Sequence, residues 1–357
     1  MPVCDPERVR PRLADIAAQA GVSEATVSRV LNDRPGVAVE TRETVLTALD
    51  VLGYERPSRL RRRSAGLIGL VVPELVNPIF PAFAQVIDTA LASHGYTPVL
   101  CTQTPGGVHE EDFVQMLCEH GVSGIIFISG EHADTQADHT SYRALVERRL
   151  PIVLINGYAE DIDAPYISTD DAAAAELAVR HLRALGHRRI GLAVGPDRFV
   201  PAVRKIAGFR RGMAEIASDA ELESWIEQSI FSVEGGQAAA LRLVERGCTA
   251  IVCGSDLMAL GAVRGVRSLG LEVPHDVSIV GYDDSAFVAF TDPPLTTVHQ
   301  SVQAMAEAAV QALIDEIAGQ PAPRAEYMFR PELVVRGSTT RARPVGVQRW
   351  ARSATSS

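Results

Sequence analysis

The sequence predicts a small all-α unit followed by a larger α/β unit that contains two parallel sheets. Residues 13–54 repeat apolar side chains at helical spacing. From residue 66, short apolar runs alternate with amphipathic stretches, as expected for parallel strands covered by helices on both faces. The alternation starts again after residue 166, so the larger unit is predicted to divide into two halves.

The first unit is predicted to contain three short helices. Leu13, Ile16 and Ala20 recur at helical spacing, and Gly21 ends that run. Ser23 is placed to cap a second helix over 24–32 by accepting a backbone N–H. A third helix ending near residue 53 carries an apolar stripe made of Val45, Leu46, Leu49 and Leu52.

The spacing within the first unit favours a helix-turn-helix. Ala17, Gly21 and Val27 supply the small, turn and inward-facing positions, and glycine adopts a positive φ without steric cost. Thr26 and Arg29 then face outward on a helix whose end fits a major groove. Arginine pairs with guanine, and hydroxyls reach phosphates or base edges. From spacing alone, a three-helix unit with no role in DNA binding remains an alternative.

The larger unit is predicted element by element from the same alternation. Buried strands are expected at 66–73, 97–101, 124–129, 151–157, 189–195, 228–231, 250–254, 277–283 and 332–337. Helices are expected at 80–93, 110–120, 141–148, 172–185, 204–217, 236–245, 257–269 and 302–317.

The domain boundaries follow from these segments. The predicted domains are a helical unit at 12–56, an arginine-rich linker at 57–66, an α/β unit at 67–340 and a disordered tail at 341–357. Within the α/β unit, the first half is predicted as about 67–160 plus 293–324, and the second as about 164–290 plus 325–340. The late segments are therefore expected to cross back between the halves.

Charge is distributed unevenly along the chain. The formal net charge is −10, but residues 1–65 hold eleven arginines and nine acidic residues, a net of +2, which leaves −12 for the rest. Five of the arginines lie within residues 56–63. A basic segment on an acidic body suits local contact with phosphate and argues against a protein that coats nucleic acid.

The expected compartment is the cytoplasm, with no membrane partner. The longest fully apolar runs are shorter than ten residues, too short to span a bilayer. No charged-then-apolar signal peptide opens the sequence. The five cysteines are odd in number and form no C-x-x-C pair, which is typical of reduced thiols.

Several longer motifs occur in a recognisable order over roughly residues 12–340. They are "ATVSRVLN" and "LGY" in the first unit, then "NPIF", "GHRRIGLAVG", "SDLMALGAV", "VSIVGYDDS" and "PPLTTVHQ". In these motifs the chain resembles the LacI/GalR family of transcriptional regulators. The resemblance implies a helix-turn-helix DNA-binding domain and a two-subdomain effector domain with the periplasmic-binding-protein-like fold. It also implies a homodimer on palindromic half-sites of double-stranded operator DNA, with a tetramer left open.

By this resemblance, one set of residues faces operator DNA. Glu24 and Ala25 fall where family members select bases, and a glutamate there accepts from cytosine while it repels phosphate. The implied DNA-facing set is Leu13, Ser23, Glu24, Ala25, Thr26, Ser28, Arg29, Asn32, Leu60 and Arg61.

Two positions depart from the family pattern. Ala38 stands where a capping serine is usual, so the third helix lacks that cap. The linker is about three or four residues shorter than usual, and Ser64 occupies the position of a leucine that the family inserts into the minor groove. Leu60 is the aliphatic residue nearby, so the arginines are expected to carry more of the binding.

A second set of residues is implied to line a ligand cleft. Ligands bind at the carboxyl ends of parallel strands, and Asp283 directly follows such a strand. The resemblance places a ligand-hydroxyl contact at Asp283 and a similar role at Asp256. Phe80 and Phe231 match aromatic residues that face or pack on the ligand, and Asp170 is a weaker candidate.

The family usually has an arginine three residues before Gly208, where this chain has Lys205, its only lysine, beside Arg204. Lysine is a point charge and lacks the planar fork of arginine. Either Lys205 still donates to a ligand hydroxyl or Arg204 takes over. Both arrangements suit a small neutral sugar, and neither favours a carboxylate held bidentately.

The sequence offers no evident catalytic, cofactor or metal site. It contains no P-loop, G-x-G-x-x-G, G-x-S-x-G or H-E-x-x-H motif. Asp283 and Asp284 form a carboxylate pair, but no third ligand stands at metal-binding spacing. A cluster that suggests a metal site is instead interpreted as a solvated polar loop: His132, Asp134, Asp138 and His139.

The sequence therefore predicts a repressor of carbohydrate-utilisation genes that a neutral sugar releases from operator DNA. Segments such as "YERPSRLR" and "VLCTQT" resemble a maltose-regulator subgroup and suggest an α-glucoside such as maltose. A sugar-binding transport protein and a sugar- or nucleotide-handling enzyme are competing classes. A regulator of the same fold that responds to a purine or phosphosugar corepressor is the alternative within the class.

Overall fold

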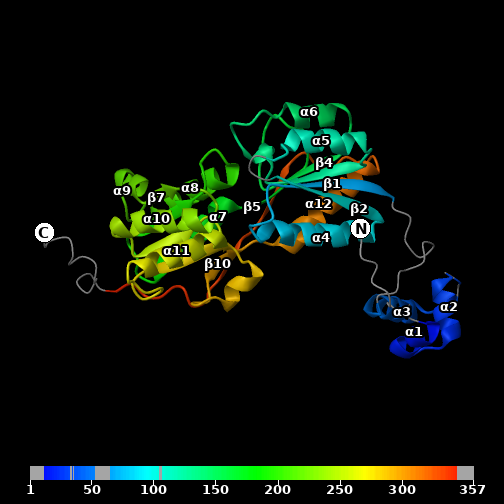
Figure 1. Cartoon of the computed structure of the whole chain (residues 1–357). Coiled ribbons are helices and arrows are strands. Elements are labelled where there is room, and N and C mark those ends of the chain that lie inside the picture. The colour runs from blue at the N-terminus through cyan, green and yellow to red at the C-terminus, as the bar shows by residue number, and fades with distance from the viewer. Residues whose placement is uncertain (1–11, 33, 35, 53–64, 104–106, 344–357) are drawn as a thin grey trace, which may run out of the picture. The chain divides into compact units, whose positions relative to one another are not determined.

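The computed structural model describes residues 12–343, apart from 33, 35, 53–64 and 104–106 (Figure 1). The chain forms two compact units, residues 1–65 and 66–357. Three linker positions discussed above, Leu60, Arg61 and Ser64, lie outside the described residues, as does the predicted tail after residue 343.

The first unit is a bundle of three helices: α1 (Leu13–Ala20), α2 (Glu24–Leu31) and α3 (Val39–Val51). Gly21 has a φ of 65° and ends α1, as its position in the sequence predicts. The small core between the helices is formed by fully buried side chains from all three, among them Ile16, Val27 and Leu49. Ala38 provides no side-chain cap for α3, in agreement with the sequence.

The first sheet of the larger unit has the order β11-β5-β4-β3-β1-β2, and all its pairs are parallel. Its strands are β1 (Gly66–Val72), β2 (Tyr96–Thr102), β3 (Gly124–Ile128), β4 (Ile152–Ile155), β5 (Tyr166–Thr169) and β11 (Glu326–Phe329). Helices α4 (Ile79–Ser93) and α12 (Val302–Ile317) cover one face. Helices α5 (Glu110–Glu119) and α6 (Thr140–Glu147) cover the other face (Figure 1).

The second sheet has the order β12-β10-β9-β8-β6-β7 and is parallel except for the pair β10–β12. Its strands are β6 (Ile190–Val194), β7 (Ile226–Gln228), β8 (Ala250–Cys253), β9 (Ser278–Asp283), β10 (Thr296–His299) and β12 (Glu332–Val334). Its helices are α7 (Asp171–Ala184), α8 (Val200–Met213), α9 (Asp219–Ser224), α10 (Val233–Glu245) and α11 (Asp256–Ser268). The predicted fold class, a helical unit followed by two parallel-sheet halves, is therefore confirmed.

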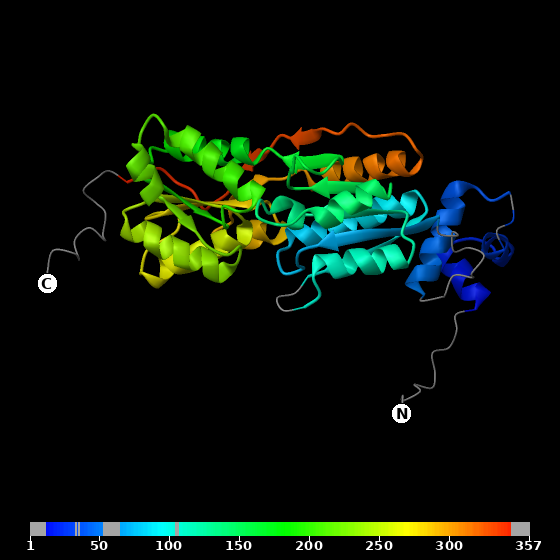
Figure 2. The same cartoon turned by 90° about the horizontal axis from the view of Figure 1, so that it is seen from above.

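The chain crosses between the two halves three times: after β5, between β10 and α12, and between β11 and β12. Figure 2 shows the late orange and red segments passing from one half to the other. The predicted division of the halves needs a correction, because β5 and β11 belong to the first sheet and β10 to the second. The physical reason is strand pairing: β5 lies between β4 and β11, and β10 lies between β9 and β12.

The described cysteines are all unpaired thiols. Cys101, Cys248 and Cys253 are buried, and Cys118 is half-buried. Burial raises the pKa of Cys248 to about 12, so this thiol stays protonated near neutral pH. The expectation of reduced, largely buried thiols agrees with these positions.

Candidate functional site

Helix α2 presents a polar face to solvent. Ser23 caps the helix by accepting the backbone N–H of Thr26 at 3.2 Å, and the two hydroxyl oxygens lie 2.9 Å apart. At the other end, the Asn32 side chain donates to the carbonyl of Ser28 at 2.8 Å. Arg29 is exposed between these caps. The bonds are all local, so both ends of the helix are fixed while Arg29 remains available to a partner.

The remaining predicted DNA-facing residues of the first unit also lie at its surface. Glu24 and Ala25 form the first turn of α2 and are exposed, and Leu13 begins α1 with an exposed side chain. The opposite side of α2 is apolar and packs into the core through Val27 and Val30. The amphipathic pattern therefore sets which side of α2 is left for contact.

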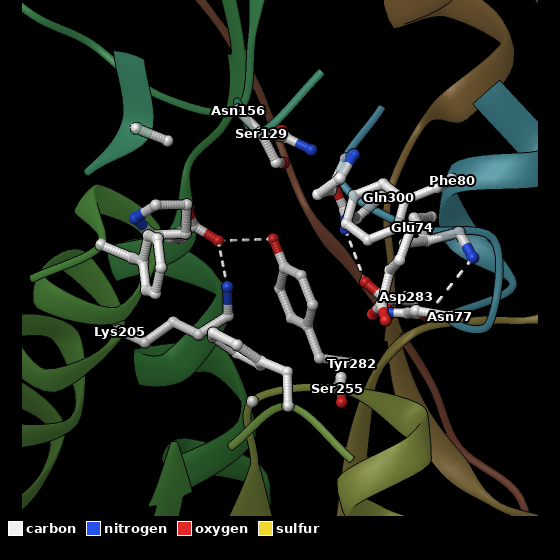
Figure 3. A pocket seen from close by; sticks show the side chains of 18 residues that line it. Glu74, Asn77, Phe80, Ser129, Asn156, Lys205, Ser255, Tyr282, Asp283 and Gln300 are labelled. Carbon is white, nitrogen blue, oxygen red and sulfur yellow. Dashed lines mark hydrogen bonds and ion pairs between the residues drawn. The ribbon is translucent and has the colours of Figure 1, made fainter. Parts of the chain in front are cut away.

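A cavity of about 190 Å³, partly open to solvent, lies between the two halves of the larger unit (Figure 3). The loops that follow β1, β3 and β4 line it from the first half, with residues such as Asn77, Ser129 and Asn156. The ends of β8 and β9 and the start of α8 line it from the second half. The cavity thus lies at the carboxyl ends of strands, where parallel sheets bind ligands.

The predicted cleft residues divide into two groups. Phe80, Lys205, Phe231 and Asp283 line the cavity, whereas Asp170, Arg204 and Asp256 do not.

Each residue of the second group is held elsewhere by its own partners. Asp170 caps α7 by accepting the N–H of Ala173 at 2.9 Å. The guanidinium of Arg204 binds both carboxylate oxygens of Glu326, at 2.6 and 2.8 Å. The prediction of Asp170 is corrected by one position, since the neighbouring Asp171 lines the cavity, and of the predicted pair Arg204 and Lys205 only Lys205 lines it.

Asp256 lies below the cavity wall and supports it. It is fully buried and accepts from the Thr297 hydroxyl at 2.6 Å and from the Ser285 N–H at 2.7 Å. Burial raises the pKa of Asp256 to about 6, although both hydrogen bonds oppose the shift. Its carboxylate therefore fixes the turn after β9, and its predicted ligand contact is corrected to this supporting position.

Lys205 is held in a buried cluster with Asp171 and Tyr282 (Figure 3). Its ammonium lies 2.5 Å from Asp171 Oδ1, and the Tyr282 hydroxyl donates to the same oxygen at 2.6 Å. The ammonium also lies 3.7 Å from the centre of the Tyr282 ring. Of the described residues that line the cavity, Lys205 is the only basic one, and Asp171 offsets its charge.

Asp283 has one carboxylate oxygen bonded and one without a partner. Oδ1 accepts from Gln300 Nε2 at 2.6 Å, and Gln300 Oε1 accepts in turn from the Thr169 hydroxyl at 3.0 Å. Oδ2 is buried and has no hydrogen-bond partner among the described residues. Burial raises the pKa of Asp283 well above its usual range; Asp256 adds to the shift and Lys205 opposes it. A buried oxygen without a donor is costly, so it favours a ligand that brings one.

The cavity is bordered by strained backbone. Ser129, Asn156 and Asp283 have φ angles of 47°, 62° and 117°, and Asp284 follows with 58°. Positive φ is rare for residues other than glycine and costs roughly 1–3 kcal/mol at each position. The first three residues line the cavity, so the strain coincides with the candidate site.

Aromatic side chains form an apolar wall of the cavity. Phe231 packs over Gly195, where an added Cβ would lie only 1.9 Å from the ring. Phe199 lies 6.5 Å from Phe231, measured between ring centres, and Phe80 lines the cavity from the first half. The ring of Phe199 was not predicted, because nothing in its local pattern separates a cleft aromatic from a core one. Gln300, at the end of the "PPLTTVHQ" motif, is another lining residue that the sequence analysis did not single out.

The polar cluster matches the solvated loop that the sequence suggested only in part, because Asp138 is exposed whereas His132 is buried. The backbone N–H of His132 donates to the Tyr142 hydroxyl at 3.2 Å, and the ring Nε2 of this buried residue lies 3.2 Å from the Ile155 carbonyl. Tyr142 donates to Glu110, which also accepts from the Glu131 N–H at 3.2 Å. Among the described residues, no group of three metal-ligating side chains gathers. The cluster instead secures the loop that carries Ser129 into the cavity.

Burial disfavours the charged forms of the groups in this cluster. It raises the pKa of Glu110 to about 7, even though Tyr142 opposes the shift with its hydrogen bond. It lowers the pKa of His132 to about 3. The loop is therefore anchored by polar groups whose charged forms are less favoured than they would be in water.

Within the described part of the chain, no helix is long and apolar enough to cross a membrane.

Family models match both parts of the chain. The model for bacterial regulatory proteins of the lacI family matches residues 12–57, and the periplasmic binding protein-like domain matches residues 179–339. Two curated relatives come from Streptomyces. The HTH-type transcriptional regulator reg1 of Streptomyces lividans is 63% identical over 336 residues, which is 93% of this chain and 97% of the relative. The HTH-type transcriptional regulator MalR of Streptomyces coelicolor is 60% identical over 334 residues, again 93% and 97%.

Solved structures agree with this assignment. A complex of the transcriptional regulator CelR with cellobiose is 30% identical, covers 92% of this chain and 100% of its own, and has a TM-score of 0.69. The lac repressor dimer bound to operator and the anti-inducer ONPF is 28% identical, covers 93% and 99%, and has a TM-score of 0.67. A regulator from Enterococcus faecium with bound ribose is 26% identical, covers 78% and 100%, and has a TM-score of 0.68. The chain therefore belongs to the lacI family of bacterial regulatory proteins and is an HTH-type transcriptional regulator.

Proposed function

We propose that this regulator represses carbohydrate-utilisation genes and leaves operator DNA when a neutral sugar binds its cleft. The observation that carries the proposal is the charge balance of the cavity. Its only basic lining residue among those described, Lys205, is already paired with Asp171. Asp283 and Glu74 add acidic groups, and burial raises the pKa of both. An anionic ligand would meet no uncommitted cation there, whereas hydroxyl groups would find acceptors.

The shape of the lining supports a sugar. Phe80, Phe199 and Phe231 offer apolar faces for the C–H side of a sugar ring. Asp283, Asn156 and Gln300 offer acceptors and amides for its hydroxyls, among them the buried oxygen of Asp283 that lacks a donor. The bound cellobiose and ribose in two related structures fit the same ligand class. The resemblance of segments such as "YERPSRLR" to a maltose-regulator subgroup makes an α-glucoside such as maltose the first candidate.

The same charge balance disfavours the alternative of a phosphosugar corepressor. A phosphate would require two or more basic donors in the cleft. Arg204, the second basic residue suggested by the sequence, is instead bound to Glu326 outside the cavity. A purine would lack this charge problem, but the sequence identities to reg1 and MalR, 63% and 60%, are about twice the 32% identity to the HTH-type transcriptional repressor PurR of Mannheimia succiniciproducens.

Operator recognition is proposed to rest on the exposed face of α2. Arg29 is the candidate for pairing with a base edge, and Glu24 and Ala25 are candidates for base selection. The operator-bound lac repressor dimer supports a homodimer that reads two half-sites.

The proposed coupling between the two functions is linkage. A ligand that favours a closed cleft shifts one half of the larger unit relative to the other. If the closed form sets the two DNA-binding units at the wrong spacing for the half-sites, operator affinity falls. A coupling free energy of about 1–3 kcal/mol gives a 5–150-fold change in affinity.

The test is a thermal-shift panel on the purified full chain with maltose, cellobiose, ribose, glucose 6-phosphate and guanine. Operator fragments selected from a random DNA library then serve in anisotropy measurements with each stabilising compound. We expect a neutral sugar to raise the melting temperature and to weaken operator binding. Stabilisation by glucose 6-phosphate or guanine alone would overturn the proposal.

A further inference from the structure

Two loops from opposite halves of the larger unit meet beside the cavity. Asp134 and Thr135 follow the first sheet's strand β3, and Arg198 and Phe199 follow β6 of the second sheet. An antiparallel bridge joins Asp134 to Phe199. The N–H and the hydroxyl of Thr135 both donate to the Arg198 carbonyl, each at 2.8 Å. The contact is therefore made largely by backbone atoms and by one hydroxyl.

The side chains extend this contact toward the cavity. Arg198 Nε lies 3.4 Å from Asp134 Oδ2, and the same guanidinium lies 4.8 Å from the centre of the Phe199 ring. Phe199 lines the cavity next to Phe231. Arg198 thus connects the bond across the cleft with the aromatic wall on which a ligand would pack.

The start of α8 is held to the first half at a second point. Arg204, one turn and a half beyond Phe199, forms its paired hydrogen bonds with Glu326 of β11, a strand of the first sheet. Pro201 and Lys205, on the same segment, line the cavity. Opening the cleft must therefore separate the start of α8 from the first half at two places.

We propose that Thr135, Asp134 and Arg198 form a clasp that positions Phe199 against the ligand when the cleft closes. The proposal deepens the proposed function, because it names the residues that close the same cleft. In this arrangement the aromatic wall is completed only when the halves meet. Thr135 and Arg198 are positioning residues, since neither lines the cavity and both act through Phe199.

Hydrogen exchange on the full chain without any effector tests the clasp. We expect Thr135→Val to speed exchange in two peptides, one around residue 135 and one around 199–203, by about 2- to 10-fold, the range that one hydrogen bond supports. Thr135→Ser, which restores the hydroxyl, should return both peptides to the wild-type rate. Thr89→Val, whose hydroxyl bonds only within α4, is the matched control. A residue with a purely local role would change only its own peptide, and that result would overturn the proposal.

The placement of Phe199 is tested by the same substitutions in a Phe199→Trp background. We expect Thr135→Val to move the emission of Trp at this position to longer wavelength, because the ring gains solvent when the clasp opens. Unchanged emission would overturn the positioning role. If Thr135→Val does not fold, Asp134→Asn, which removes the ion pair but keeps the shape, takes its place in both measurements. Because no sugar is present, a failure of the clasp is distinguishable from a failure of the proposed effector.

Discussion

The exposed face of α2 and the lining of the cleft present polar side chains in opposite ways. On α2, the hydrogen bonds of Ser23 and Asn32 join residues three or four positions apart, and Arg29 is left to solvent. In the cleft, Asp283 and Gln300 are buried and fixed by partners from distant parts of the chain. A ligand would therefore meet a preorganised site, whereas the proposed DNA contact Arg29 would be ordered only on binding.

The difference indicates at which residues a substitution can change binding without changing the stability of the fold. On the proposed function, removing an exposed side chain of α2 is expected to remove a contact with DNA, and it leaves the helix packed through Val27 and Val30. Removing a cleft side chain alters a network that also joins the two halves. Substitutions in the two regions are therefore expected to affect stability and binding separately, and the largest effect is expected in the core of the first unit.

Leu49→Ala tests the small core beneath α2. Leu49 is fully buried, and such a truncation costs about 2–5 kcal/mol, which approaches the whole stability of so small a unit. We expect the first unit to unfold and DNA binding to disappear, while the calorimetric transition of the larger unit is unchanged. Val51→Ala, at a position 65% exposed on the same helix, is the control and should melt like the wild type. Retained operator binding by Leu49→Ala would contradict the prediction.

Glu110→Gln tests the buried side of the contrast through pH. Because folding raises the pKa of Glu110 from about 4.5 to about 7, the folded state binds the proton more tightly than the unfolded state. The free energy of unfolding therefore falls as pH rises through this interval, by at most about 3 kcal/mol. We expect urea unfolding to show that Glu110→Gln gains stability relative to the wild type between pH 4.5 and 7.5. Glu111→Gln, at the exposed neighbouring position, should differ from the wild type in free energy of unfolding by the same amount at every pH. The same pH-independent difference for Glu110→Gln would contradict the raised pKa of Glu110.

Asp283→Asn separates ligand binding from stability within the cleft. The substitution keeps an oxygen for Gln300 but removes a buried charge whose second oxygen has no partner. We expect the effector-free variant to melt at a higher temperature at a pH where the wild-type carboxyl is ionised, because the cost of burying that charge is gone. The sugar that stabilises the wild type in the thermal-shift panel should bind about 10- to 150-fold more weakly, as for the loss of a charged hydrogen bond. A lower melting temperature together with unchanged sugar affinity would place Asp283 outside the ligand site.

Arg29→Ala tests the exposed side of the contrast. Loss of an arginine that pairs with a base edge should weaken specific operator binding by about 5- to 150-fold, equivalent to 1–3 kcal/mol. The melting of the first unit should not change, because Arg29 makes no core contact. Arg180→Ala, an exposed arginine on α7, is the matched control for the lost charge. Equal loss of affinity for specific and random DNA would assign Arg29 to phosphate contact instead.

The sequence predicted those parts of the fold that depend on local pattern. Strands such as β3 and β8 are continuous apolar runs that become fully buried, and α2 starts at its capping serine. Strands β5 and β11 were missed because their mutual pairing spans about 160 positions, as in Tyr166 beside Glu326, and only the other edge of β5 pairs with a nearby strand, β4. No window of neighbouring residues contains that information.

The candidate site shows the same limit on a smaller scale. The resemblance to known regulators placed Phe80, Phe231 and Asp283 correctly at the cavity. It did not separate Lys205 from Arg204, because adjacent residues on a helix point about 100° apart and only the packing of α8 decides which one faces the cleft. The unpaired oxygen of Asp283 was equally hidden, since it depends on the full set of its neighbours.

The three crossings between the halves have a consequence for the order of synthesis. The first sheet acquires its last strand at Glu326–Phe329 and the second at Glu332–Val334. When the ribosome has synthesised the early segments of either half, the sheet of that half is therefore still incomplete. Both halves reach their full complement of strands within a few residues of each other, near the end of translation. The two lobes of the sensor thus mature together, and a regulator truncated before residue 326 lacks a strand from each.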